Sequence, residues 1–124
     1  MRVRVALILS LSLSIPVTTL YAAGDADRGA TLYEARCTGC HSLDTNRVGP
    51  MDQGVIGRKA GRVNGYLYSD ALRKSTVVWS AMTLDQWLTD PESLIPGQKM
   101  GYSVSAATDR ADIIAYLTRQ STAR

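Results

Sequence analysis

The five consecutive residues CTGCH, Cys37 to His41, contain both cysteines and the single histidine of this 124-residue chain. All thiol and imidazole groups of the protein therefore lie within about one turn of backbone. A chain of this length forms one domain, and a small domain buries little apolar surface. This one has no phenylalanine, two tryptophans and six tyrosines. We therefore expect that something besides side chains fills part of the interior.

The first 23 residues have the pattern of a secretory signal peptide. Two arginines precede an apolar run over residues 5–15, and an Ala-Ala pair closes the segment at Ala23. We expect cleavage after Ala23, which leaves one domain over residues 24–124. The alternative is an uncleaved anchor, but serines and Pro16 interrupt the apolar run, and a spanning helix needs about 20 mostly apolar residues. We therefore expect a periplasmic protein, in a compartment that oxidises free thiol pairs.

The charge balance argues against a nucleic-acid partner. Loss of residues 1–23 would remove two arginines and no acidic residue, so the 14 basic and 11 acidic residues of the chain would become 12 and 11. The remaining basic residues alternate with acidic ones and form no long basic patch. We expect neither nucleic-acid binding nor, after cleavage, stable insertion into a membrane.

Four chemistries could use the CTGCH motif. A structural zinc site usually takes four cysteine or histidine ligands, whereas the motif offers three. A thiol–disulfide exchange site places CxxC among βαβ units, but the longest β-branched stretch after the signal peptide is residues 76–79. A plain disulfide would close a very short loop and contribute little stability. Covalent haem uses all three side chains, because Cys37 and Cys40 add to its vinyl groups and His41 becomes the proximal iron ligand.

Covalent haem is the chemistry that we predict for this motif. Haem iron held by one histidine has a second axial position, and the ligand at that position decides between catalysis and electron transfer. The chain has no second histidine, and methionine is the common partner in c-type carriers, although a lysine is conceivable. Met100 lies in LIPGQKMGY, where Pro96-Gly97 turns the chain and lets the loop present one side chain to a flat cofactor. For Met51 and Met82, ordinary packing in the core is the better interpretation. We therefore predict that His41 and Met100 bind the iron.

Cap and periodicity signals predict two terminal helices. Asp25 or Asp27 can cap a first helix that runs to about Cys37, with Gly29 on one of its faces. A last helix begins near Thr108 and has an apolar stripe.

The middle of the chain is expected to contain short helices and much loop. A T-x-x-Q capping box that starts at Thr83 predicts a helix over residues 84–90, which Pro91 stops. Ser69 can cap a short helix over residues 70–74. Residues 42–65, with five glycines, are expected to form irregular loop packed on a large cofactor.

Several segments carry a family resemblance: GDADRGATLYEARCTGCHS, VGP, GRKAG, GYLYSDAL, the region of Trp79, IPGQKM and RADIIAYL. In this order they resemble class I cytochromes c, in particular the mitochondrial-type and related bacterial carriers, over essentially all of residues 24–120. The resemblance implies an all-α cytochrome c fold, in which the N- and C-terminal helices cross and short middle helices and loops wrap around a covalent haem. It implies that Gly29 allows the close approach of the two helices.

The same resemblance implies further contacts with the haem. Arg58, Tyr68 and Trp79 match residues that serve the haem propionates. The backbone carbonyl of Pro50 matches one that accepts a hydrogen bond from the ring of His41 and fixes the orientation of the imidazole.

Some positions depart from the mitochondrial pattern. Trp87 stands where a tyrosine commonly approaches the methionine sulfur, and Asp52 occupies a place that is usually apolar. Gln98 replaces a threonine, and Tyr102 replaces a phenylalanine near the exposed haem edge. These differences bear on the value of the redox potential and leave the prediction of a covalent haem unchanged.

We predict a monohaem one-electron carrier and not an enzyme, a monomer that meets its donor and acceptor proteins in transient complexes. Asp90 and Glu92 flank the rim that lysines surround in mitochondrial carriers, so we expect a mixed or apolar docking patch. One alternative is a haem sensor or weak peroxidase in which Met100 detaches, and another is a dedicated cytochrome subunit of a dehydrogenase complex. No residue supplies an evident distal acid or base for peroxide chemistry.

Overall fold

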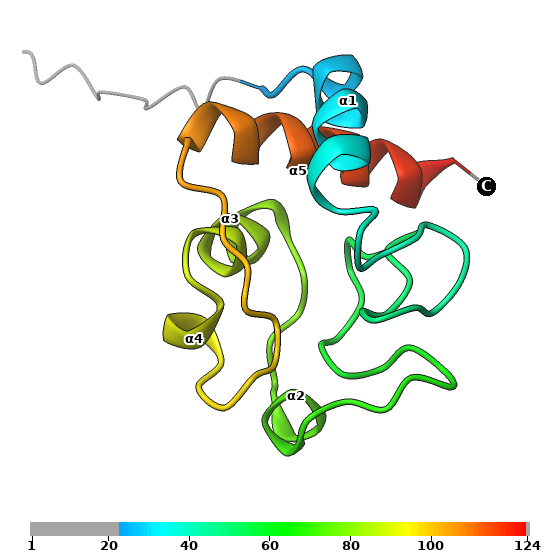
Figure 1. Ribbon diagram of the computed structural model, residues 1–124, viewed down its shortest axis with the longest axis vertical. Coiled ribbons are helices and arrows are strands. Elements are labelled where there is room, and N and C mark those ends of the chain that lie inside the picture. The colour runs from blue at the N-terminus through cyan, green and yellow to red at the C-terminus, as the bar shows by residue number, and fades with distance from the viewer. Residues whose placement is uncertain (1–22, 124) are drawn as a thin grey trace, which may run out of the picture.

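The computed structural model describes residues 23–123, which form helices and loops (Figure 1). The helices are α1 (Ala26–Arg36), α2 (Asp70–Lys74), α3 (Ala81–Thr89), α4 (Pro91–Leu94) and α5 (Ala107–Thr122). The described part of the chain contains no strand, only an isolated β-bridge between Lys59 and Val78. The prediction of an all-α domain is confirmed. The expected signal peptide falls almost entirely on residues 1–22, which lie outside the described residues.

Helix α1 begins after Asp25, one of the two caps that the sequence offered. The Asp25 carboxylate accepts hydrogen bonds from the backbone N–H groups of Asp27 and Arg28, at 2.9 and 3.0 Å. These bonds satisfy two of the free donors at the helix N-terminus, and they hold the pKa of Asp25 below its ordinary value. Gly29 and Tyr33 form the buried face of the helix. The predicted first helix is therefore confirmed.

Helices α1 and α5 cross at Gly29 (Figure 1). A Cβ atom added to Gly29 would lie 1.9 Å from the carbonyl oxygen of Asp112 in α5, so the two backbones touch where the side chain is missing. Arg28 closes the crossing by pairing with the Asp109 and Asp112 carboxylates, and Arg36 adds a second contact to Asp109 at 3.1 Å. The close approach that the resemblance implied for Gly29 is confirmed.

Helix α3 begins earlier than predicted. Ser80 is its N-cap, and Ser80 and Thr83 form the capping box: the Ser80 hydroxyl accepts from the Thr83 N–H at 3.2 Å, and the Thr83 hydroxyl accepts from the Ser80 N–H at 2.8 Å. The prediction that Thr83 caps a helix starting at residue 84 was wrong, because Thr83 supplies the second half of the box. The buried stripe of α3 consists of Leu84, Trp87 and Leu88.

Pro91 both ends α3 and begins α4. Its missing N–H costs nothing in the first turn of a helix, and the Asp90 carboxylate caps that turn by accepting from the N–H groups of Glu92 and Ser93. The predicted stop is confirmed, and the additional helix α4 was not predicted. Farther back in the chain, Ser69 caps α2 as expected, with its hydroxyl accepting from the Leu72 N–H at 3.3 Å.

The segment from the end of α1 to the start of α2 is irregular, as predicted, and lies opposite α3 and α4 (Figure 1). Backbone hydrogen bonds around the isolated bridge hold it in place, from Gly57 N–H to Trp79 O at 2.8 Å and from Trp79 N–H to Arg58 O at 2.9 Å. Gly61 adopts φ +70° where a Cβ would lie 2.3 Å from the Leu72 carbonyl oxygen. The loop therefore packs directly on α2.

Arg110 joins α5 to α3 and to the segment between α4 and α5. Its Nε donates to the Asp85 carboxylate at 2.7 Å, and its Nη1 donates to the carbonyl oxygens of Val104 and Ser105, each at 2.9 Å. The guanidinium is buried and paired, as a buried charge must be. This one side chain therefore positions the chain that follows Met100.

One hydrophobic cluster connects all parts of the fold. It draws on α1, on the loop, on α2, on α3 and on α5. Its buried members are Tyr33, Val55, Ala60, Leu72, Trp79, Leu84, Trp87, Leu88, Ile95, Val104, Ile113, Ile114 and Leu117. In residues 23–123 we find no helix that is long and apolar enough to cross a bilayer.

Candidate functional site

Helix α1 runs directly into the CTGCH motif. Cys37 is its C-cap, and the carbonyl oxygen of Cys37 accepts from the N–H groups of Cys40 and His41, at 3.1 and 2.8 Å. One tight turn therefore holds both thiols and the imidazole. Both thiols are free; Cys37 is half-buried and Cys40 is exposed. Among the described residues, no three His, Cys, Asp or Glu side chains are placed to hold a metal ion together.

The Pro50 carbonyl and the Gly49 backbone hold the His41 ring in place. Its Nδ1 lies 2.8 Å from the carbonyl oxygen of Pro50, the contact that the resemblance implied. A Cβ added to Gly49 would lie 2.2 Å from the ring Cε1, so the imidazole lies directly against the Gly49 backbone. Because Nδ1 faces an acceptor, Nε2 is the nitrogen that remains for a metal.

Asp52 is a second neighbour of Nδ1 that sequence reasoning noted only as an unusual residue. Its Oδ1 lies 3.3 Å from His41 Nδ1, and its Oδ2 accepts a hydrogen bond from the Tyr33 hydroxyl at 3.0 Å. Burial lowers the pKa of His41, but Asp52 and the Pro50 carbonyl outweigh that effect, and the net pKa lies above its ordinary value. Burial and then the charge of Asp52 raise the pKa of Tyr33.

The same carboxylate acts on the nearest thiol. Burial raises the pKa of Cys37 to about 12, and the negative charge of Asp52 contributes to the increase. The CTGCH turn, Tyr33 and Asp52 thus form one half-buried cluster. An acid at a place that is otherwise apolar was the only signal in the sequence that could have located it.

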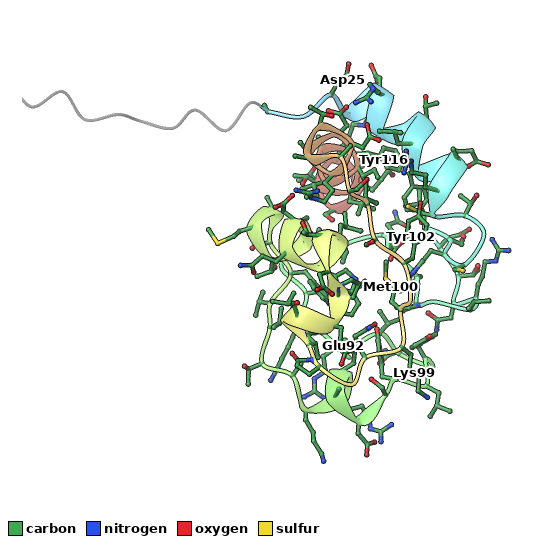
Figure 2. All side chains as sticks on the ribbon, turned by 60° about the vertical axis from the view of Figure 1, so that its left-hand side comes forward. Asp25, Glu92, Lys99, Met100, Tyr102 and Tyr116 are labelled. Carbon is green, nitrogen blue, oxygen red and sulfur yellow. The ribbon has the colours of Figure 1, made fainter. Side chains whose placement is uncertain are left out.

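Met100 lies on the segment between α4 and α5, with Tyr102 beside it (Figure 2). The indole Nε1–H of Trp87 donates to the Met100 sulfur at 3.2 Å. Met100 also packs against the hydrophobic cluster. Sequence reasoning left open whether the indole reaches this sulfur, and the structure shows that it does. The interpretation of Met82 as a core residue was wrong, because Met82 is 72% exposed, whereas Met51 is partly buried.

Glu92 holds the turn that precedes Met100. Its carboxylate accepts from the backbone N–H of Gly97 at 2.9 Å and from the Gln98 side-chain amide at 3.2 Å. The Gln98 amide oxygen in turn accepts from the backbone N–H of Met100. Figure 2 shows Glu92 on α4, below Met100 in that view. We call this chain of contacts the methionine-loop latch.

The three residues expected near the propionates are close neighbours. The backbone hydrogen bond from the Trp79 N–H to the Arg58 carbonyl places these two residues next to the isolated bridge, and Tyr68 is close enough to Arg58 to affect its pKa. Arg58 donates to the carbonyl oxygens of Gln53 and Met51, at 3.1 and 2.9 Å, and burial lowers its pKa. The Tyr68 hydroxyl accepts from the Val63 N–H at 3.3 Å.

The aromatic rings link this group to the methionine. Trp79 packs edge-on against Trp87, with ring centroids 5.3 Å apart, and Trp87 donates to Met100. Cys37, Tyr68 and Met100 all pack against the same hydrophobic cluster. The predicted site residues therefore come together around one apolar interior.

The residues present fit haem c. Two free thiols in CxxC spacing can form thioethers, and the adjacent imidazole has its Nδ1 occupied and its Nε2 available. A half-buried thioether held by an indole supplies a second ligand of the type that haem iron takes. Arg58 offers a half-buried cation for carboxylates.

Comparisons with known proteins agree with this donor set. The family model described as cytochrome c matches residues 26–121. The cytochrome c of Gibberella zeae is 42% identical over 100 residues, which cover 77% of this chain and 94% of that protein. The cytochrome c2 of Rhodomicrobium vannielii is 39% identical over 104 residues, which cover 81% and 82%.

A solved structure shows the same fold. Cytochrome cH from Methylobacterium extorquens is 45% identical to this chain and superimposes with a TM-score of 0.74, over 77% of this chain and 99% of that one. The chain therefore belongs to the cytochrome c family, whose members are electron-transfer proteins and not enzymes. It binds haem c and its iron covalently, and Cys37 and Cys40 have the spacing of the attachment motif.

Proposed function

We propose that this chain is a periplasmic monohaem carrier that accepts one electron from a redox protein and passes it to another, and that His41 and Met100 would hold the haem iron. Bound haem c supplies the iron that alternates between the ferric and ferrous states. The observation that carries the proposal is the hydrogen bond of 3.2 Å from Trp87 to the Met100 sulfur, because it holds a thioether in place at the apolar interior.

Fixed ligands suit electron transfer. The Pro50 carbonyl and the Gly49 backbone restrain the His41 ring, and Trp87 with the methionine-loop latch restrains Met100. Side chains that are held in one geometry need little rearrangement when an electron arrives or leaves. A thioether ligand and a buried site both favour the ferrous state and raise the reduction potential.

Arg58, Tyr68 and Trp79 are proposed to bind the propionates. Arg58 and Tyr68 are both partly buried, and Trp79 is buried. Two carboxylates beside an apolar interior need donors or a cation, and a guanidinium supplies five N–H donors. This support comes from the chemistry and proximity of the three residues.

The surface near Met100 favours a mixed docking patch. A shallow pocket of about 440 Å³ has Asp90, Glu92, Met100 and Tyr102 among its lining residues, and Tyr102 is 43% exposed. Lys99 lies on the same segment (Figure 2). Acidic, aromatic and basic groups here do not form one strong field, so steering by charge alone is weak. We expect a transient encounter of below about 1,200 Å² with each partner, and a monomer between encounters.

The periplasmic location rests on the first 23 residues and on bacterial relatives. The arginines, apolar run and Ala-Ala pair are those of an export signal, and a cytochrome c2 and a cytochrome cH from bacteria are among the matches. Mass spectrometry of the purified haem protein tests this part. We expect a chain that begins at Gly24 and carries one covalent haem; an intact segment 1–23 would contradict cleavage.

The ligand assignment is tested by the absorption spectrum of the oxidised protein. We expect a weak charge-transfer band toward the red end in the parent protein and in Met82→Ala, whose exposed side chain makes it a matched control. The band should vanish in Met100→Ala. Its absence from the parent, or its survival in Met100→Ala, would overturn Met100 as the ligand.

A further inference from the structure

We propose that Asp52 is a positioning residue for His41 and that it lowers the reduction potential of the site by sharing the Nδ1 proton of His41 with the Pro50 carbonyl. The inference rests on the proposed role of His41 as an iron ligand. Asp52 would then lower the reduction potential, whereas the Met100 thioether raises it.

The geometry places the carboxylate beside the ring. Asp52 Oδ1 lies 3.3 Å from Nδ1, and the side chains of His41 and Asp52 are 17% and 16% exposed. The backbone N–H of Asp52 donates to the Ser42 carbonyl at 2.9 Å, so the loop fixes the position of the acid. The hydrogen bond of Nδ1 goes to the neutral Pro50 carbonyl at 2.8 Å, and the anionic Asp52 oxygen lies next to it at 3.3 Å.

Tyr33 holds the other oxygen of the carboxylate. Its hydroxyl donates to Asp52 Oδ2 at 3.0 Å, and Tyr33 is buried in the hydrophobic cluster. Arg58 is close enough for the charge of Asp52 to act on it, but its guanidinium donates to backbone carbonyl groups instead. Tyr33 and His41 are thus the two side-chain donors that face the carboxylate.

The physical effect follows from these two donors. A carboxylate that accepts from the free N–H of a ligating histidine makes the ring a stronger base, and a stronger base favours the ferric ion. A half-buried negative charge acts in the same direction and is screened less than an exposed one. The hydrogen bond from the Tyr33 hydroxyl stabilises part of the negative charge of Asp52, so Tyr33 weakens the lowering of the potential by Asp52. Neutralising Asp52 should therefore raise the potential, and removing the Tyr33 hydroxyl should lower it.

The experiment compares five haem-loaded proteins by equilibrium redox titration at pH 7: the parent, Asp52→Asn, Tyr33→Phe, the double variant and Asp44→Asn. Asp44 is a matched control, because it is an exposed carboxylate on the same loop that accepts from Ser42. Asp52→Asn should shift the ferrous-to-ferric ratio about tenfold toward the ferrous form, which is 59 mV for one electron. Tyr33→Phe should shift it in the other direction, and this shift should be lost when Asn replaces Asp52.

Two outcomes that involve Asp52→Asn would overturn the inference. Asp52→Asn could shift the potential no more than Asp44→Asn does, or Tyr33→Phe could have the same effect with and without the carboxylate. Tyr33→Phe keeps the charge in place, so the direction of its own shift is a test that does not depend on Asp52→Asn loading haem: no shift, or a shift toward the ferrous form, would overturn the inference.

A second measurement separates this inference from the ligand assignment. In the ferric protein the ring resonances of a ligating His41 are shifted strongly by the iron, and in the ferrous protein the Nδ1–H resonance should move upfield in Asp52→Asn. Unshifted ferric ring resonances would overturn His41 as the ligand. Shifted ferric resonances together with an unchanged Nδ1–H resonance would overturn only the role of Asp52.

Discussion

The indole Nε1–H of Trp87 points at the sulfur of Met100 across 3.2 Å, and the ring behind it packs edge-on against Trp79. The aromatic contact fixes the direction in which the indole donates. A donor to sulfur withdraws electron density from the thioether, which then binds ferric iron less well. With Met100 as the proposed ligand, Trp87 would tune the site from a helix that carries no proposed ligand.

Replacing Trp87 by phenylalanine should lower the reduction potential, because the ring stays and the donor is lost. The shift should correspond to less than about 1 kcal/mol, the usual net contribution of a neutral hydrogen bond. Redox titration measures it, and Trp87→Tyr is the control that retains an O–H donor. An equal fall in both variants would show that packing, and not the hydrogen bond, sets the potential.

The methionine-loop latch predicts how easily an external ligand displaces Met100. In Glu92→Ala the Gly97 N–H and the Gln98 amide lose their acceptor, and we expect imidazole to bind the ferric protein about fivefold faster, as for a loss of about 1 kcal/mol. Stopped-flow absorption measures the rate. Glu34→Ala, which removes an exposed carboxylate from α1, should leave it unchanged, and equal acceleration in the two variants would contradict the latch.

Gly29→Ala has two opposite effects on the stability of the fold, one from helix propensity and one from packing. Propensity alone would stabilise α1 by about 1 kcal/mol. The added methyl group would meet the backbone oxygen of Asp112 at 1.9 Å, and backbone cannot move away as a side chain can. We expect a net destabilisation of about 1–3 kcal/mol, the usual effect of overpacking, measured by urea unfolding of the haem protein. A more stable variant would show that the helices separate without cost.

The cap of α1 predicts a dependence on pH. Backbone hydrogen bonds from Arg28 and Asp27 hold the pKa of Asp25 below its ordinary 3.8. A lowered folded-state pKa stabilises the fold above the unfolded value, and this stabilisation is lost as the pH falls through the folded value. Asn at this position keeps the cap but cannot titrate. The difference in Tm between the parent and Asp25→Asn should be constant above about pH 5 and should shrink below about pH 4; a constant difference down to pH 2.5 would contradict it.

Local signals allowed the helix termini to be predicted where a single cap residue decides them. Asp25 and Ser69 both act within three residues of the cap, so the sequence contains all the information. At α3 two overlapping patterns compete, and the local hydrogen bond from the Thr83 hydroxyl to the Val78 carbonyl at 2.9 Å favours the earlier start. The exposed position of Met82 follows from the same helix, since its buried stripe begins at Leu84.

Contacts between distant residues could not be predicted in this way. The pairs Asp52–His41 and Arg110–Asp85 leave no periodic pattern in the sequence. Asp52 and His41 lie in one irregular loop, and Arg110 and Asp85 lie on α5 and α3. Only the folding of the loop, or the packing of the two helices, brings each pair within reach. The CTGCH motif was predictable because all its chemistry is contained in one turn.

From helix α5, Arg110 reaches two other parts of the molecule: the helix that carries Trp87 and the chain that follows Met100. Loss of the Arg110 side chain would therefore release α3 and this segment from α5 at the same time. One of the two released parts carries the indole that donates to the Met100 sulfur, and the other is the chain that follows this methionine, so a single cation outside the site holds both surroundings of the sulfur in place.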